Sequence, residues 1–327
     1  MSVKSLQSSL SWLNAKGYAQ GVFWIICVSF VSNGNDILMR LLGSRLPSME
    51  IAFCRFFFAA LILLPIMLYK GTSAFKTSHP VWHFLRGILG FGAVASWCYG
   101  VGKAPLAVVS TIALTVPLFV LPMALVFLRE KVGWQRTVAT LAGFVGILFV
   151  LYPDISQIQS LKTGVLNSGV MFLLFAAVLF ALSDIVNKFM VAKESQLTLL
   201  FYFAVVTTLA GAWPAYQVWI APTSHEFVLL FILGMGGNLI LYFLLKAFAA
   251  VDVSALAPYR YVELIFAGVF GFLFFSEIPG LYSFIGAAII VPSTFAIAYY
   301  ETHKSNRNTK KAQKKQNIAQ AEMGAIA

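Results

Sequence analysis

Long apolar segments alternate with short polar connections along almost the whole chain. A window of about 20 apolar residues is long enough to cross the hydrocarbon core of a bilayer as a helix. Ten such windows are present, at residues 20–40, 48–69, 80–101, 105–128, 133–152, 165–190, 196–219, 227–249, 254–276 and 280–300. The pattern therefore predicts an all-α integral membrane protein with ten transmembrane helices.

Two motifs recur at nearly the same spacing and indicate two related halves. The sequence NDILMR at 35–40 closes the first span, and the similar sequence SDIVNK at 183–188 closes the sixth. The fourth and ninth spans likewise end in Glu130 and Glu277. Because each half holds an odd number of spans, the second half enters the membrane from the opposite side. We therefore expect two inverted five-helix repeats, which are typical of transporters that alternate access around a midplane site.

The spans and the repeat predict the organisation of the chain. The expected segments are a cytoplasmic N-terminal stretch (1–19), a first five-helix repeat (20–152), a polar linker (153–164), a second five-helix repeat (165–300) and a basic cytoplasmic tail (301–327).

Composition excludes a soluble protein and charge indicates the orientation. Apolar residues make up 60% of the chain and charged residues 11%, against about 45–50% and 25% in soluble domains. With both termini in the cytoplasm, sixteen of the 23 Lys and Arg residues face inward, three lie near membrane depth and four face outward, namely Arg40, Arg45, Lys103 and Lys162. This is the positive-inside pattern. The net charge of +11 is therefore expected to face anionic lipid headgroups rather than nucleic acid.

A charged pair in the ninth span is the strongest candidate for function. A charge at membrane depth costs about 2.5–3.5 kcal/mol, so it indicates a partner, a cavity or a function. Arg260 and Glu263 are three residues apart and share a helical face. Pro258 removes a backbone donor beside them, and Tyr259 and Tyr261 flank the arginine. Two interpretations are open: a buried ion pair that locks the helix, or a zwitterion site with Arg260 for a carboxylate and Glu263 for a cation.

Four other charged residues lie near the ends of spans. Arg55, about one and a half turns into the second span, either snorkels to the interface or lines a cavity. Arg86 is close to the start of the third span and is expected at the interface. Glu130 and Glu277 end their spans and are also expected at the interface.

Asp36 and Asp184 are related by the repeat and lie near the ends of their spans. Interfacial capping and gating between the repeats are both open for them. Asp36 follows Asn35 in a polar stretch, which favours gating there.

Two aromatic residues and two glycine-rich stretches complete the candidates. Trp97 and Tyr99 form either an interfacial belt or an aromatic wall for a planar or cationic ligand. Stretches 87–92 and 234–237 occupy equivalent spans of the two halves, where small residues permit close helix contact.

The sequence contains no phosphate-binding loop, zinc-ligand spacing or catalytic triad. We therefore expect no enzyme, no cofactor and no bound metal, and we exclude an ATP-driven pump on this chain alone. The three cysteines fall inside apolar runs and are expected to be core residues.

The pattern resembles the EamA-like branch of the drug/metabolite transporter superfamily, which has two repeats and ten helices. The resemblance is carried by Glu130, Glu277, Arg55 and the sequence TVPLF at 115–119, which contains Pro117. The ninth span departs from the proline motif common in that branch and has Val-Glu-Leu at 262–264 instead.

That departure points to a smaller group of transporters within this branch. The sequences at 257–264, 35–36, 50–58 and 183–188 look like those of the S-adenosylmethionine uptake transporters of obligate intracellular bacteria, and the likeness covers about residues 20–300. It implies an inner-membrane carrier, a monomer or a homodimer, with exchange for S-adenosylhomocysteine as one mode of transport. Arg260 would meet the substrate carboxylate and Glu263 its ammonium or sulfonium. The adenine would meet an aromatic residue among Tyr259, Tyr261, Trp97 and Tyr99.

Two other functions are open from the sequence, because fold does not fix function. One is an exporter of amino acids or of amphipathic drugs and metabolites. The other, from a different class, is a membrane scaffold without a transport role.

Overall fold

The computed structural model describes residues 17–101, 112–113, 115–130, 133–158 and 168–275, with isolated positions between 285 and 300. Every element in these residues is helical. The elements are α2 (Tyr18–Leu42), α3 (Ser48–Lys70), η2 (Thr72–Phe75), α4 (Pro80–Val101), α6 (Val116–Phe127), α7 (Trp134–Ile158), α8 (Ser168–Val191), α9 (Gln196–Gln217), α10 (Ser224–Ala250), α11 (Val253–Leu256), η3 (Ala257–Val262) and α12 (Glu263–Phe275).

The helices follow the predicted spans. Five of them, α2, α3, α8, α9 and α10, are long and apolar enough to cross a membrane. α4 and α7 match the third and fifth predicted spans, α6 matches part of the fourth, and α11 to α12 match the ninth. The tenth predicted span, 280–300, lies largely outside the described residues. α7 continues to Ile158, into the predicted linker, because an apolar pattern marks the hydrocarbon core and not the end of a helix.

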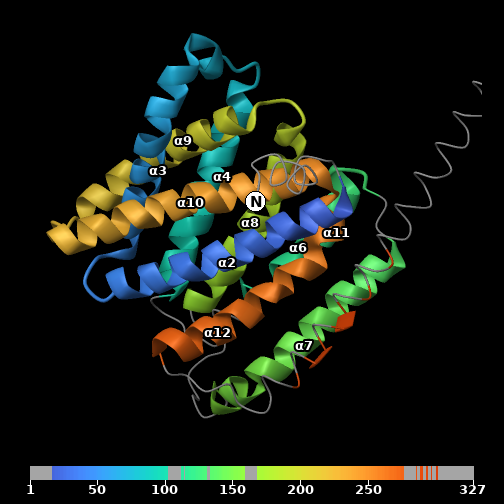
Figure 1. Cartoon of the computed structure of the whole chain (residues 1–327). Helices are drawn as coiled ribbons and strands as arrows, with labels where there is room; N and C mark the ends of the chain where they lie inside the picture. The colour runs from blue at the N-terminus through green and yellow to red at the C-terminus, as the bar shows by residue number, and fades with distance from the viewer. Residues whose placement is uncertain are drawn as a thin grey trace, which may run out of the picture.

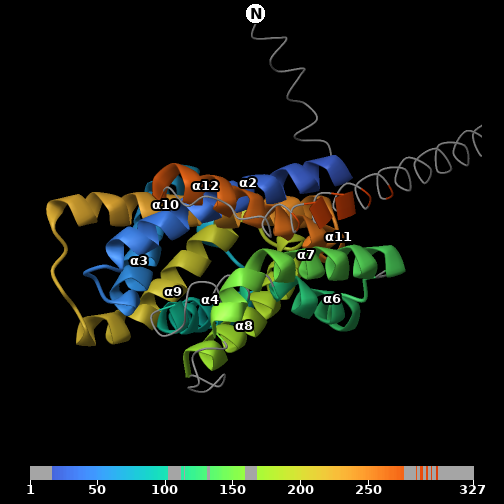
Figure 2. The same ribbon diagram turned by 90° about the horizontal axis from the view of Figure 1, so that it is seen from below.

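The two halves pack as interlocked copies. The most extensive helix contact joins α2 to α10, and its counterpart under the repeat, α8 with α4, comes next. α3 packs on α9, and the α3–α10 contact is repeated as α9–α4. α2, α10 and α12 lie side by side, and α3 packs across α10 (Figure 1; Figure 2). α4 packs against α8 and α9, and α7 lies at the edge of the bundle (Figure 1). This exchange of partners is what two repeats related by a pseudo-two-fold axis produce.

Glycines at matching positions let the halves approach closely. Gly234 in α10 lies against Phe58 of α3, and Gly87 in α4 lies against Val206 of α9. Phe58 and Val206 are 148 positions apart, so the contact is the same in both halves. A side chain at either glycine would overlap its neighbour. The prediction that both glycine-rich stretches permit close helix contact is confirmed.

The ninth span is a discontinuous helix. The short α11 is followed by the 3-10 segment η3 and then by α12. Pro258 lies in the first turn of η3, where it lacks the N–H that a continuous α-helix would need. The prediction that Pro258 loosens this helix is confirmed. Breaks of this kind are typical of helices that form the substrate sites of transporters.

Glu130 anchors the start of this broken span. Arg129, with φ 54°, turns the chain at the end of α6. The Glu130 carboxylate then accepts hydrogen bonds from the N–H groups of Val253 and Ser254, both at 3.1 Å, and from the Ser254 hydroxyl at 2.6 Å. The residue is buried within the protein, which its place at the end of a span did not predict. The local sequence marks the end of a span but not the distant helix terminus that the carboxylate caps. Glu277 lies outside the described residues.

Glu130→Ala should destabilise the protein. Two buried N–H groups would lose their acceptor, at about 1–3 kcal/mol each. We expect a clearly lower apparent unfolding temperature in detergent. Glu130→Gln retains one acceptor oxygen and should lose less than half as much stability. Equal unfolding temperatures for Glu130→Ala and the wild type would contradict the anchoring role.

A clamp built on a glutamate side chain lies at each end of the bundle. At one end, Arg45 in the α2–α3 loop binds Glu226 through two nitrogens, with Nε 2.7 Å from Oε1. At the other end, Glu194 in the α8–α9 loop accepts from the Thr77 hydroxyl at 2.7 Å and lies 3.2 Å from His79 Nδ1. The α2–α3 and α8–α9 loops are equivalent under the repeat. Each clamp therefore ties one half to the other.

Glu194→Gln should weaken its clamp at neutral pH. Burial opposes ionisation of Glu194, but hydrogen bonds from Thr77, His79 and the Ser78 amide outweigh it and lower its pKa. The lowered pKa means that the clamp stabilises the fold above the usual glutamate pKa of about 4.3 and that this contribution is lost as pH falls through the lowered value. We expect the variant to be less stable by about 2 kcal/mol at pH 7.

Thermal unfolding of the wild type and Glu194→Gln over a series of pH values checks this. The difference between the two proteins should be full at neutral pH and should shrink only in acid. A difference that does not change with pH would contradict the charged clamp.

Candidate functional site

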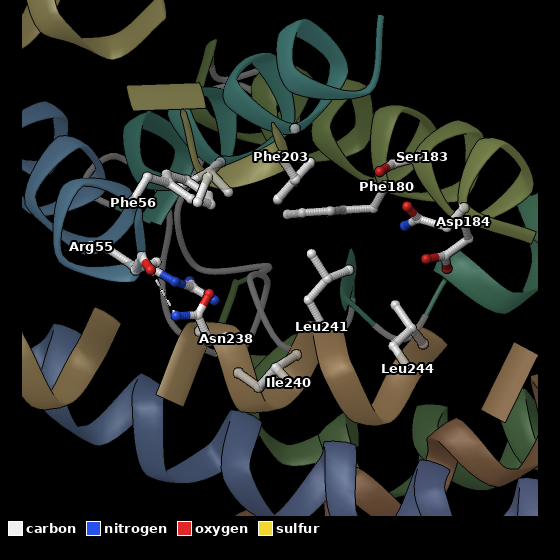
Figure 3. Close-up of a pocket in the computed structure, with 16 residues that line it drawn as sticks. Arg55, Phe56, Phe180, Ser183, Asp184, Phe203, Asn238, Ile240, Leu241 and Leu244 are labelled. Carbon is white, nitrogen blue, oxygen red and sulfur yellow. Dashed lines mark hydrogen bonds between the residues drawn. The ribbon is translucent and has the colours of Figure 1, made fainter. Parts of the chain in front are cut away.

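A cavity of about 150 Å³ lies between the two halves. Its wall is built by α3 and α4 of the first half and by α8, α9 and α10 of the second. Arg55 and Asn238 lie at one end (Figure 3). Ser183 and Asp184 lie at the opposite end (Figure 3). Between them, aliphatic side chains of α10 face three aromatic rings, those of Phe56, Phe180 and Phe203.

Arg55 faces this cavity. Its guanidinium lies 5.7 Å from the centre of the Phe56 ring, and a Cβ at Gly237 would lie 3.0 Å from its Nε. The position equivalent to Arg55 in the second half, 148 residues on, is Phe203. Phe203 lies against Gly90 as Arg55 lies against Gly237. The two halves therefore present a cation and an aromatic ring at equivalent places in one cavity.

The structure pairs Arg260 with Asp184. Arg260 Nη2 and Asp184 Oδ2 are 2.5 Å apart. Asp184 is buried in α8, and Arg260 belongs to η3, so the pair joins the broken span to the first helix of the same repeat. The sequence left open whether Arg260 pairs with Glu263. Its ion-pair partner in the structure is Asp184.

Glu263 lies at the start of α12, beside α2. Its side chain forms a hydrogen bond with Ser32 and interacts electrostatically with Asp36 and Arg260. Asp36 also interacts electrostatically with Arg55, and its side chain remains accessible. Glu263 is thus close to Arg260 and to a second carboxylate. Glu263, Asp36 and Arg260 are not among the residues that line the cavity.

These contacts connect five charged side chains into one cluster. In order along the cluster they are Arg55, Asp36, Glu263, Arg260 and Asp184. Three of them are carboxyl groups and two are guanidinium groups, so one formal negative charge is uncompensated. A substrate with one net positive charge would balance the cluster.

The two predicted tyrosines of the ninth span are engaged within the protein. The Tyr18 hydroxyl donates to the Tyr259 hydroxyl at 3.1 Å, and the two rings meet edge to face. Tyr261 is buried with its ring over Gly143 of α7. Neither tyrosine is among the residues that line the cavity.

The two predicted aromatic residues of α4 lie outside the cavity wall. Trp97 packs edge-on against Phe180, so it supports one of the wall rings from behind. Tyr99 is 37% exposed and packs against Phe172. The structure therefore does not bring these two side chains together at one surface.

Asn35 and Pro117 contribute to helix packing. Asn35 in α2 donates to the Leu233 carbonyl of α10 at 3.4 Å, and Gly236 leaves room for its amide. Pro117 is buried in the first turn of α6.

Comparison with known families assigns the fold. The model of the EamA-like transporter family matches residues 19–152 and, a second time, residues 167–299. The chain belongs to the EamA-like transporter family. This EamA-like transporter carries the family domain twice, in agreement with the duplicated repeat predicted from the sequence. It is a multi-pass membrane protein and not an enzyme.

Individual relatives support the assignment. This EamA-like transporter is 43% identical over 286 residues to the S-adenosylmethionine uptake transporter of Rickettsia prowazekii, covering 88% of this chain and 95% of the relative. The protein of the same name from Rickettsia felis is 42% identical, with 89% and 97% covered. A riboflavin transporter of Vibrio cholerae is 29% identical, with 88% and 96% covered. A crystal structure at 16% identity matches with a TM-score of 0.71 over 87% of this chain and 96% of its own, which supports the fold.

Several cavity residues of this EamA-like transporter were missed from the sequence. They are Phe56, Phe180, Asn187, Phe203 and Asn238. The repeat offset would have led from Arg55 to Phe203, and Asn187 lies within the recurring motif at 183–188. Arg86, which was expected at the interface, is fully buried within the protein.

Proposed function

We propose that this EamA-like transporter takes up S-adenosylmethionine. The Rickettsia relatives named for that activity are similar over almost their whole length. S-adenosylmethionine carries an ammonium, a sulfonium and a carboxylate, hence one net positive charge. The cluster of Arg55, Asp36, Glu263, Arg260 and Asp184 has one uncompensated negative charge. The similarity to these relatives carries the proposal, and a negative charge within this cluster suits the sulfonium of the substrate.

The charge match also separates the proposal from a second substrate class. Riboflavin transporters are among the relatives, at 27–29% identity. Riboflavin has neither an ammonium nor a sulfonium, so it offers no cationic group to the carboxylates of the cluster. The identity and the electrostatics therefore both favour the cationic substrate.

Two groups of residues would recognise the two ends of the cation. Glu263 and Asp36 would supply the negative charge opposite the sulfonium. The rings of Phe56, Phe180 and Phe203 would contact the adenine, in place of the aromatic residues expected from the sequence. Stacked rings contribute about 0.5–1.5 kcal/mol each beyond the area they bury.

Transport would occur by alternating access. The inverted repeat, the discontinuous ninth span and a clamp at each end supply the parts that such a cycle requires. The distribution of Lys and Arg supports an inner-membrane protein with both termini in the cytoplasm. In that orientation the Arg45–Glu226 clamp faces outward and the Glu194 clamp inward. In an exchange cycle the carrier would bring one S-adenosylmethionine in and take one S-adenosylhomocysteine out.

Uptake by intact bacteria tests the proposal. Cells that do not import S-adenosylmethionine should accumulate the labelled compound when they express this protein. Unlabelled S-adenosylhomocysteine should compete, whereas methionine and riboflavin should not. Accumulation no greater than in cells with an empty vector, or equal competition by riboflavin, would reject this substrate.

A further inference from the structure

Arg86 in α4 lies directly behind the wall of the cavity and is fully buried. Its Nε donates to Asn187 Oδ1 at 2.7 Å, and its Nη1 donates to the Leu199 carbonyl at 3.2 Å. Its guanidinium carbon lies 5.4 Å from the centre of the Phe203 ring. Asn187 and Phe203 both line the cavity. Arg86 therefore contacts two residues of the cavity wall, Asn187 and Phe203, from behind.

Arg86 differs from the other two arginines at membrane depth because it has no acidic partner. Arg260 pairs with Asp184, and Arg55 interacts with an aspartate of α2. Within the described part of the chain, no carboxylate pairs with Arg86, and its Nη2 has no hydrogen-bond partner. Arg86 interacts electrostatically with His83, one turn earlier, which carries no negative charge. A buried guanidinium without a counter-charge is costly, so an anion in the cavity is drawn toward it.

Asn187 links Arg86 to the surface of the cavity. Because Arg86 Nε is bonded to Oδ1, the amide has a fixed orientation, with Nδ2 as its other end. Among the described residues, Nδ2 makes no hydrogen bond, and Asn187 lines the cavity. The cavity therefore presents a fixed N–H donor with a positive charge behind it, one helical turn from Asp184.

We propose that Asn187 and Arg86 form the subsite for the carboxylate at the amino-acid end of the substrate, an inference that rests on the proposed function. Asn187 Nδ2 donates to the carboxylate. Arg86 is a positioning residue that fixes the amide and supplies the positive charge. Arg260, which the sequence suggested for this role, is instead held by Asp184. The carboxylate then binds at the α4–α8 side of the cavity, and the sulfonium binds toward Glu263.

Calorimetric titration of the purified protein with two ligands tests this subsite. The ligands are S-adenosylmethionine and its decarboxylated analogue. In Arg86→Gln and Asn187→Asp, the ratio of the analogue's Kd to that of S-adenosylmethionine should fall about tenfold relative to the wild type, because only the carboxylated ligand loses a contact. Asn187→Asp gives Arg86 a carboxylate partner of nearly the same size. It should therefore keep the fold and decide the outcome even if Arg86→Gln does not fold.

The double variant Asp184→Asn/Arg260→Gln is the matched control. It should bind both ligands more weakly but keep the wild-type ratio. An unchanged ratio in Asn187→Asp, or a tenfold fall in the double variant, would overturn the Asn187–Arg86 subsite. Binding of neither ligand by the wild type would overturn the proposed function itself.

Discussion

Glu263→Gln should lower the uptake of S-adenosylmethionine about 100-fold, equivalent to about 2.7 kcal/mol, while leaving the protein folded. Glutamine has nearly the same shape as glutamate but no charge. The substitution removes the uncompensated negative charge of the cluster, so the sulfonium loses its counter-charge. Two charges 4 Å apart interact by about 4 kcal/mol at an effective dielectric constant of 20, which makes a loss of this size reasonable.

The measurement is initial uptake at several substrate concentrations, with Asp252→Asn as the control. Asp252 undergoes the same change from carboxylate to amide, but it lies in the loop before α11 and is half exposed. Its uptake should stay close to that of the wild type. Glu263→Gln should also lose preference for S-adenosylmethionine over S-adenosylhomocysteine, which lacks the sulfonium charge. Normal uptake by Glu263→Gln would place the recognition of the cation elsewhere.

Asp184→Asn should be the most destabilising single substitution in the cavity. It leaves the Arg260 guanidinium at membrane depth without its partner, and removing one member of a buried ion pair costs about 3–5 kcal/mol. We expect a large fall in the unfolding temperature and in the amount of folded protein in the membrane. Transport should be lost with it.

The double variant Asp184→Asn/Arg260→Gln separates folding from transport. It removes both charges, so most of the stability should return, because a neutral pair carries no uncompensated charge. Uptake should stay low, since the cluster that surrounds the cation has been altered. Thermal unfolding and uptake of the two variants check this. A double variant that is no more stable than Asp184→Asn would contradict the ion-pair account.

The helices and the repeat were predictable because lipid imposes strong rules on the chain. A segment that spans a membrane must be apolar over its length and must satisfy its own backbone hydrogen bonds, so the spans are visible as composition. The repeat is visible because Asp36 and Asp184 lie in similar sequences, NDILMR and SDIVNK. Pro258 marked the break in the ninth span, since proline has one local effect wherever it occurs.

The cavity wall was much less predictable. In a soluble protein the apolar face of a helix identifies its buried side, but here the lipid-facing and protein-facing sides are both apolar. Phe180 and Phe203 therefore look like any other phenylalanine of the chain. Only packing shows that they face the cavity while Tyr99 does not.

The burial of Arg86 and Glu130 was not predicted, for a related reason. Their places near the ends of spans suggested the interface, because sequence reports depth along one helix. Their partners, Asn187 and the start of α11, come from helices more than 100 residues away. No local pattern encodes those contacts, and so the burial of both residues emerged only from the fold.

Exchange in liposomes is the most direct test of the central claim, that this protein is a carrier for S-adenosylmethionine. Purified protein is reconstituted into liposomes loaded with unlabelled S-adenosylmethionine, and labelled S-adenosylmethionine is added outside. We predict rapid accumulation of label that depends on the internal substrate and that is reduced about 100-fold by Glu263→Gln. Label no higher than in protein-free liposomes, or equal accumulation in Glu263→Gln, would contradict the account.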